Sequence, residues 1–335
     1  MFFIKGVSSA FPDYFYKQDD IIEFSKRIFS KNTDFSKMLK VYKNSGVKSR
    51  FLVNDLEWYL QKNDWKERSI RFKKSAIDIL RKSITLTLKK TNYKAKDIGA
   101  IIVINTTGIV TPSLDAEIIN LLDFNNNIKR LPIFGYGCAG GVLGLNRAIE
   151  IKKNIKKPVL VCNIELCSLT FRPQIVTKEN IISTALFGDG ASSYIVDNEG
   201  KCGVVKSVDY SWKNSLNLMG WSIENDGLGV IFDKEIPRFI KKELPSVINK
   251  FFSIKKKGFI LHSGGMKIIN SYKKIFNNHP TIKYSQDILS SYGNVSSVSV
   301  ILVLKEILEN NAKGKFIMSA MGPGFSAGLS ELVIK

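Results

Sequence analysis

Cysteine and histidine are both scarce in this chain of 335 residues, which has four cysteines and two histidines. The cysteines form no Cys-x-x-Cys pair and have no histidine at the spacing of a zinc site. We therefore expect neither a disulfide framework nor a bound metal, and four reduced thiols. The four cysteines are Cys138, Cys162, Cys167 and Cys202.

Long apolar runs are also lacking, since none reaches the roughly 18 residues of a membrane-spanning helix. The N-terminus, residues 1–7, is too short an apolar stretch for a secretory signal and has no basic region before it. We expect a protein of the cytoplasm without a membrane span.

Acidic side chains are few relative to basic ones, with 30 Asp and Glu against 50 Lys and Arg and a net charge of +20. The lysines lie in short clusters spread through the chain, such as Lys152-Lys153 and Lys255-Lys256-Lys257. No zinc finger, RNA-binding aromatic motif or basic zipper accompanies them. We do not expect nucleic acid as a partner, and a phosphate-bearing small molecule needs only a few of these charges.

The apolar pattern indicates a layered α/β fold, because short buried strands alternate with amphipathic helices. We expect strands over residues 98–104, 131–136, 159–164, 191–197, 258–262, 315–320 and 328–334, and helices over 66–90, 139–155, 236–252, 266–276 and 295–309. The chain is long enough for two fused halves, which we place at 1–200 and 201–335. No proline-rich or serine-rich linker separates them, so we expect one continuous core.

Cys138 follows an apolar stretch and is flanked by small residues in the run Gly137-Cys138-Ala139-Gly140-Gly141, where a helical pattern begins. A thiol at a helix N-terminus is expected to have a lowered pKa and to be nucleophilic. The small neighbours leave room for an acyl group. A buried structural cysteine beside a tight turn is the alternative.

Two polar residues are candidates to act with this cysteine. His262 ends an apolar strand and precedes Ser263-Gly264-Gly265, whereas His279 lies in a polar turn and is expected to be exposed. Asn294 stands just before a helix. A satisfied buried histidine and a simple N-cap asparagine are the alternatives for these two residues.

Cysteine, histidine and asparagine together suit thioester exchange and carbon–carbon bond formation. A thiolate paired with an imidazole attacks an acyl thioester, and the imidazole and an amide N–H then hold the oxygen of a second thioester as it becomes an enolate. Thiol proteases use the same residue types, but their Cys-Gly-Ser-Cys-Trp-like surroundings are absent here.

Six motifs, in this order, resemble those of type III polyketide synthases, the chalcone-synthase-like enzymes. They are Gly137 to Gly141, Glu165-x-x-Ser168-Leu169-Thr170-Phe171-Arg172, Ala185 to Gly190, His262-x-Gly264-Gly265, Tyr292-Gly293-Asn294-x-Ser296-Ser297 and Gly322-Pro323-Gly324-Phe325. Residues 219–232 are similar to the bacterial branch, which includes alkylpyrone and alkylresorcinol synthases.

The resemblance implies a thiolase-like five-layered αβαβα fold, a homodimer, and an acyltransferase without a permanently bound cofactor. It implies that an acyl-CoA starter is loaded on Cys138 and extended with malonyl-CoA by decarboxylative condensation, with His262 and Asn294 supporting both steps. Cyclisation would give a pyrone, resorcinol or phloroglucinol-type product.

By the same resemblance, Phe187 matches the aromatic gatekeeper between the coenzyme A tunnel and the reaction cavity. Thr106 matches a residue that lines the cyclisation cavity. Lys37 and Lys40 match basic positions that contact coenzyme A phosphates, and a solvated helix face is their alternative.

Two positions depart from the family pattern. Ser263 stands where the family usually has proline after the catalytic histidine, and Val230 stands where plant enzymes carry a second gatekeeper phenylalanine. The smaller side chain of Val230 leaves more room, which leads to the hypothesis that the starter group is aliphatic and can be long.

Two other functions remain open at this point. A β-ketoacyl-acyl-carrier-protein synthase III shares the fold and the three residue types, but its usual His-Gln-Ala-Asn segment is replaced by His262-Ser263-Gly264-Gly265. A catalytically idle binding protein on the same fold is the rival of another class. The starter group, the number of extensions and the mode of ring closure are not determined by the sequence.

Overall fold

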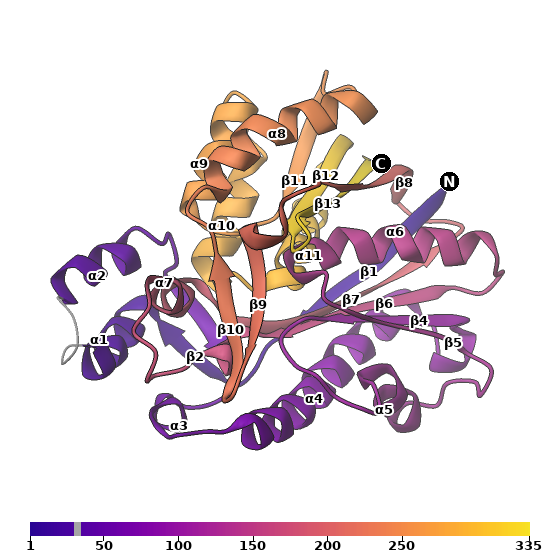
Figure 1. The fold of residues 1–335 in the computed structure, drawn as a ribbon. Helices are drawn as coiled ribbons and strands as arrows, with labels where there is room; N and C mark the ends of the chain where they lie inside the picture. Colours follow the sequence, from indigo (N-terminus) through magenta and orange to yellow (C-terminus); the bar gives the residue numbers. More distant parts are fainter. Residues whose placement is uncertain (30–34) are drawn as a thin grey trace.

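The computed structural model of the protein describes residues 1–29 and 35–335, with the side chains of 35–37 left out as well. Its centre is a nine-stranded mixed sheet with the order β11-β12-β13-β8-β1-β7-β6-β4-β5 (Figure 1). The strands of this sheet are β1 (Phe2–Ala10), β4 (Ala100–Asn105), β5 (Lys129–Phe134), β6 (Val159–Leu166), β7 (Asp189–Asp197), β8 (Cys202–Ser211), β11 (Lys257–Leu261), β12 (Gly314–Gly322) and β13 (Ser326–Ile334).

Two separate two-stranded sheets lie outside the central sheet. They are formed by β2 (Tyr14–Lys17) with β3 (Ser49–Leu52) and by β9 (Met219–Glu224) with β10 (Gly227–Phe232). The α-helices are α1 (Gln18–Phe29), α2 (Phe35–Lys43), α3 (Leu56–Leu60), α4 (Trp65–Thr91), α5 (Leu114–Leu121), α6 (Gly140–Lys153), α7 (Lys178–Leu186), α8 (Ile236–Phe251), α9 (Met266–Ile275), α10 (Ile282–Tyr292) and α11 (Ser296–Glu309). Short 3₁₀ turns are η1 (Ala95–Asp97), η2 (Gly137–Ala139), η3 (Cys167–Thr170) and η4 (Leu216–Leu218).

Three hydrophobic clusters stack the elements into five layers. The central cluster joins α6 and α11 to the inner faces of both ends of the sheet. A second cluster packs α4 and α5 on the outer face of β4 and β6, and a third packs α8, α9 and α10 on the outer face of β11 and β12. The order α, β, α, β, α confirms the predicted fold class.

The central helices α6 and α11 are buried on most of their surface, which explains why their sequences are apolar or small at nearly every position. Both begin at the same side of the molecule, where the site lies. No helix of the described ranges is both long and apolar enough to cross a membrane.

The two ends of the sheet come from the two parts of the sequence. Strands β1, β4, β5, β6 and β7 precede residue 200, and β8, β11, β12 and β13 follow it. β1 pairs with both β7 and β8, so hydrogen bonds join the two ends without a linker. This agrees with the expected continuous core.

The predicted strands and helices are all present, with ends shifted by a few residues. The sequence analysis placed no element in the first 65 residues and missed the helices α5, α7 and α10, the strand β8 and the hairpin β9–β10. Most of these segments are short or lie at the surface. Their apolar residues therefore do not repeat with a helix or strand period over a long stretch.

Candidate active site

Cys138 lies in the turn η2, directly before the first residue of α6. Gly137 has a φ of +50°, and a Cβ there would lie 2.6 Å from Cδ of Pro323. Only glycine fits this turn without displacement. The turn therefore places the thiol at the N-terminal end of a central helix, as predicted, and in a buried position.

Burial changes the electrostatics of this thiol in the direction opposite to the prediction. Desolvation raises the pKa of Cys138 to about 12, while hydrogen bonds with Ser296 and Asn294 lower it by less. The expected low pKa of this thiol is therefore wrong. The cysteine is a protonated thiol at neutral pH and needs a base when it attacks a substrate.

Asn294 is positioned by the segment between α10 and α11. Its backbone N–H donates to the carbonyl of Leu186 at 2.7 Å, and its carbonyl accepts from Gly188 at 3.1 Å. The side-chain Oδ1 accepts from the Ser296 N–H at 2.9 Å, which directs Nδ2 to the other side. Asn294 is thus brought next to Cys138, whose pKa it lowers through a hydrogen bond.

His262 follows the last residue of β11 and is buried. Its ring lies beside Gly264, where an added Cβ would lie 3.2 Å from Nε2. The carbonyl of Gly264 in turn accepts a hydrogen bond from Nδ2 of Asn294 at 3.3 Å, so Gly264 links the two residues. Burial lowers the pKa of His262 to about 4, so the imidazole is neutral at pH 7. Nδ1 has no hydrogen-bond partner within the described residues.

Ser263, which replaces the usual proline, is fully buried. Its hydroxyl finds no partner in the part of the chain that the structure describes. A buried polar group without a partner costs free energy, and two such groups, Nδ1 of His262 and the hydroxyl of Ser263, lie on neighbouring residues.

Glu165, quoted above only as part of a motif, is the centre of a buried network. Its Oε2 accepts from the Thr106 N–H and the Thr107 hydroxyl, both at 3.0 Å. Its Oε1 accepts from the hydroxyls of Ser296 at 3.2 Å and Ser297 at 2.8 Å. Burial outweighs these bonds and raises the pKa of Glu165 to about 7.

This network reaches the nucleophile from two sides. The hydroxyl of Thr106 accepts from the Gly137 N–H at 2.9 Å, and Ser296 contacts both Glu165 and Cys138. Sequence reasoning missed Glu165 as a functional residue. A charged residue in the fully buried strand β6, whose other residues apart from Asn163 are apolar, is the signal that marks it.

A pocket opens onto Cys138, and Phe187 and Val230 are among its lining residues. The hairpin β9–β10 forms one wall with Met219, Gly220, Trp221, Val230 and Phe232. Trp221 pairs with Val230 across the hairpin, and its ring lies 6.1 Å from that of Phe187. The sequence analysis did not single out Trp221, which takes up part of the room expected beside Val230.

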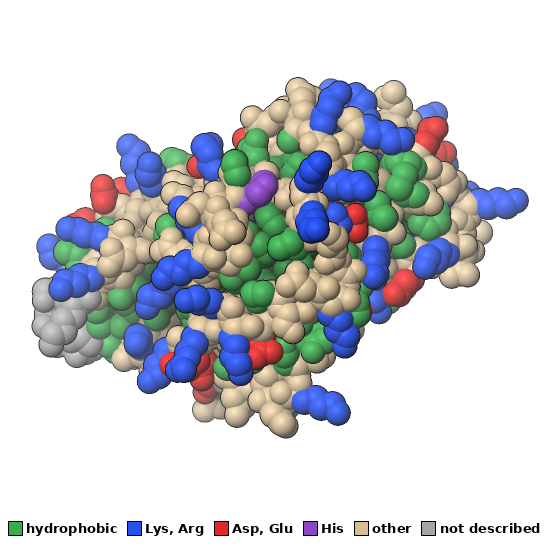
Figure 2. Space-filling model, turned by 90° about the horizontal axis from the view of Figure 1, so that it is seen from above, with side chains coloured by type: hydrophobic (Ala, Val, Ile, Leu, Met, Phe, Trp, Pro, Cys, Tyr) green, Lys and Arg blue, Asp and Glu red, His purple; other side chains and the backbone are tan. Residues whose placement is uncertain are grey.

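The two predicted coenzyme A contacts lie on one helix. Lys40 is an exposed residue of α2, and the side chain of Lys37 lies outside the described part of the structure. Figure 2 shows many Lys and Arg side chains and few acidic ones around a central apolar area of one face.

No group of three or more possible metal ligands is found among the described residues. The four cysteines are free and buried. Asn294, Ser296 and, behind them, Glu165 are the polar residues grouped around Cys138. His262 does not line the pocket of Cys138, and it is linked to Asn294 through Gly264. A thiol, a carboxamide and a neutral imidazole are groups that suit acyl transfer and stabilisation of an enolate oxygen.

The five layers, with a buried cysteine at the start of a central helix, define a thiolase-type condensing enzyme. Family models agree and are more specific. The N-terminal domain model of chalcone and stilbene synthases matches residues 3–200, and the C-terminal domain model matches residues 207–331. The chain belongs to the chalcone and stilbene synthase family and is a type III polyketide synthase.

Curated relatives cover nearly the whole chain. A protein of Bacillus subtilis (strain 168), named "Putative chalcone synthase", is 32% identical over 356 residues, 98% of each chain. The phloroglucinol synthase of Pseudomonas fluorescens is 26% identical and covers 96% of this chain, which spans 95% of that protein.

Solved structures share the fold. The 1,3,6,8-tetrahydroxynaphthalene synthase of Streptomyces coelicolor superposes with a TM-score of 0.93 at 23% identity, covering 99% of both chains. The type III polyketide synthase domain of Steely1 from Dictyostelium gives a TM-score of 0.93 at 24% identity, with the same coverage. The chain is thus an acyltransferase that uses coenzyme A thioesters as substrates.

Proposed function

We propose that the enzyme loads an acyl-CoA starter on Cys138 and extends it with malonyl-CoA by decarboxylative Claisen condensation. The observation that carries this proposal is the contact of Cys138 with Asn294 and Ser296 in a pocket at the start of α6. The backbone N–H of Ser296 fixes the orientation of the Asn294 amide, which a purely structural cysteine would not need.

In the loading step, Sγ of Cys138 attacks the thioester carbonyl of the starter, and His262 takes the thiol proton. A neutral imidazole is the form that accepts a proton, and the lowered pKa of His262 keeps it neutral at pH 7. The proton then leaves with the thiol of coenzyme A, so that the acyl group stays on the sulfur.

In the extension step, malonyl-CoA loses carbon dioxide and its thioester oxygen becomes an enolate. Nδ2 of Asn294 carries two hydrogens, and only one is directed to Gly264. We assign the other, with the N–H of His262, to the enolate oxygen. The carbanion then attacks the acyl carbonyl on Cys138, and the bond between that carbon and Sγ breaks. The extended chain is then carried on coenzyme A, and the Cys138 thiolate takes up a proton from solvent.

The other predicted site residues have supporting roles in this proposal. Phe187 separates the approach of coenzyme A from the cavity, and Thr106 borders the growing chain close to the nucleophile. Lys37 and Lys40 on α2 contact phosphates of coenzyme A. Val230 admits an aliphatic starter in preference to a rigid aromatic one, in a space that Trp221 bounds.

The product is a pyrone, resorcinol or phloroglucinol-type ring in this proposal. Support comes from the relatives, whose names include a phloroglucinol synthase and a 1,3,6,8-tetrahydroxynaphthalene synthase. Residues 1–200 then supply the nucleophile and residues 201–335 supply His262 and Asn294.

We also propose a homodimer in the cytoplasm. The outer backbone edge of β5 and the apolar side chain of its residue Phe134, which is 53% exposed, lie at one end of the central sheet. A second copy that packs there would cover them. The four free thiols suit a reducing compartment.

Mass spectrometry of the loaded enzyme tests the proposal. After incubation with a panel of acyl-CoA starters, the peptide that contains Cys138 is expected to gain the acyl mass, and Cys138→Ala is expected to lose it completely. Cys162→Ala, which removes a buried thiol outside the pocket, serves as the control and keeps the adduct.

A second measurement separates the two steps. Asn294→Ala is expected to load the starter but to release carbon dioxide from malonyl-CoA about a hundredfold more slowly, because one enolate donor is gone. Full condensation by Asn294→Ala, or an adduct on another residue, contradicts the proposal.

A further inference from the structure

The hairpin β9–β10 supplies five of the eleven residues that line the Cys138 pocket, yet it pairs with no strand of the central sheet. An isolated two-stranded hairpin is only marginally stable. Its position, and with it the width of the pocket, must therefore depend on contacts with the rest of the molecule. The rings of Trp221 and Phe232 pack against that of Phe187, and further contacts lie at the two ends of the hairpin.

The open end of the hairpin, where β9 begins and β10 ends, is held by a backbone hydrogen bond. The Asp233 N–H donates to the carbonyl of Leu218 at 2.9 Å, directly outside β9 and β10. Met219 and Phe232 pack there against the cluster of α8 and α9. This end is therefore held by one backbone hydrogen bond and by apolar packing.

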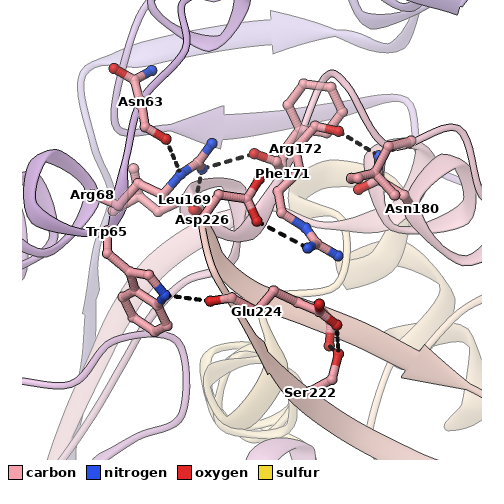
Figure 3. Close-up of polar contacts among 12 residues, drawn as sticks. Asn63, Trp65, Arg68, Leu169, Phe171, Arg172, Asn180, Ser222, Glu224 and Asp226 are labelled. Carbon is pink, nitrogen blue, oxygen red and sulfur yellow. Dashed lines mark hydrogen bonds and ion pairs between the residues drawn. The ribbon is translucent and has the colours of Figure 1, made fainter.

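The turn end is held by side chains from two other elements (Figure 3). Nη1 of Arg172 pairs with Oδ1 of Asp226 at 3.1 Å, and Nε1 of Trp65 donates to the carbonyl of Glu224 at 2.6 Å. A glycine of β10 allows the approach of Arg172, since a Cβ on Gly229 would lie 2.8 Å from its Nη2.

Arg172 is itself fixed to the opposite wall of the pocket. It follows η3, which carries the lining residue Cys167, and its carbonyl accepts from Nδ2 of Asn180 at 2.9 Å. Arg68 donates to the carbonyls of Leu169 and Phe171 at 2.7 and 2.8 Å, which braces the same segment from α4. The ion pair with Asp226 thus joins two walls of one pocket.

We propose that Arg172 and Asp226 are positioning residues that hold the β9–β10 wall at a fixed distance from Cys138 and so limit the length of the polyketide chain. The side chains of Trp221 and Val230 contact the growing polyketide chain, and the ion pair fixes the position of these two side chains. The effect on chain length rests on the proposed function, but the effect on the hairpin does not.

Asp226→Asn is the variant of choice, because it removes the charge at constant shape from a side chain that is 40% exposed. Trp65→Phe removes the second tether and keeps a ring. Asp209→Asn is the matched control, since Asp209 is 39% exposed, pairs with Arg147 and lies outside the pocket.

Two readouts are measured on the full chain. The first is cleavage after Glu224 by a glutamate-specific protease, which we expect to be about two- to fivefold faster in Asp226→Asn and faster again with Trp65→Phe. The second is the ratio of longer to shorter polyketides from malonyl-CoA with a fixed starter, which we expect to rise by a similar factor, with unchanged loading of Cys138.

The outcomes separate the two proposals. If cleavage is faster in Asp226→Asn but Cys138 is never loaded, the ion pair does anchor the hairpin and the proposed function is overturned. Faster cleavage and normal loading with an unchanged product ratio overturns the limit on chain length. A cleavage rate equal to that of the wild type and of Asp209→Asn overturns the anchor itself.

Discussion

At the scale of single residues, burial dominates the electrostatics of the site. It raises the pKa of Cys138 and of Glu165 and lowers that of His262, so all three are held in or near their neutral forms. A site of neutral groups avoids the cost of buried charge until substrate arrives. The residue types were evident from the sequence, but their protonation was not.

The buried carboxyl group of Glu165 predicts how the free energy of unfolding depends on pH. Its pKa is about 7 in the folded protein against 4.5 in a model compound, so the folded state retains a proton that the unfolded chain has lost between pH 4.5 and 7. The free energy of unfolding therefore falls as the pH rises through this window and is level above it. The fall amounts to at most roughly 3 kcal/mol.

Glu165→Gln is expected to lack this fall, because it has no proton to lose and keeps one carbonyl acceptor. His262, with its lowered pKa, gives the opposite slope between about pH 4 and 6.5 in both proteins, so the difference between wild type and variant isolates Glu165. Denaturant unfolding between pH 5 and 8 measures it, and parallel pH curves would contradict the assignment.

At the scale of elements, the site depends on the close packing of α6 against α11. Gly141 of α6 faces the carbonyl of Ser297, since a Cβ there would lie 2.4 Å from that oxygen and 2.4 Å from Cγ1 of Val300. The small residues around Cys138 were interpreted from the sequence as room for the substrate. For Gly141 the structure gives another reason, which is helix packing.

Gly141→Ala is therefore expected to force α6 and α11 apart and to destabilise the protein by about 1–3 kcal/mol. Gly220→Ala is the control, because no atom lies within 4 Å of the added methyl group and Gly220 has no positive φ. Thermal unfolding of both variants checks this. Equal melting temperatures would show that the two helices can adjust without cost.

At the scale of the whole molecule, the central sheet is open at the edge strand β5. Phe134→Lys places a charge at this exposed edge, where a second copy is proposed to pack, and is expected to shift the protein from dimer to monomer. Sedimentation velocity at several concentrations measures the state. The exposed Ile254→Lys change, outside β5, is the control and leaves the dimer intact.

The sequence by itself determined the family motifs, the long helices α4, α6, α8 and α11, the buried strands, and Cys138, His262 and Asn294 as candidates. These features are local: a regular apolar period or a short motif carries them. The four donors to Glu165 and the anchor Arg172–Asp226 depend on the tertiary structure, because they join residues more than 50 positions apart. The hairpin with Trp221 is a local element, but its place beside Cys138 also depends on the fold. Burial, which sets the protonation of the site, is likewise a property of the packed layers and not of any segment.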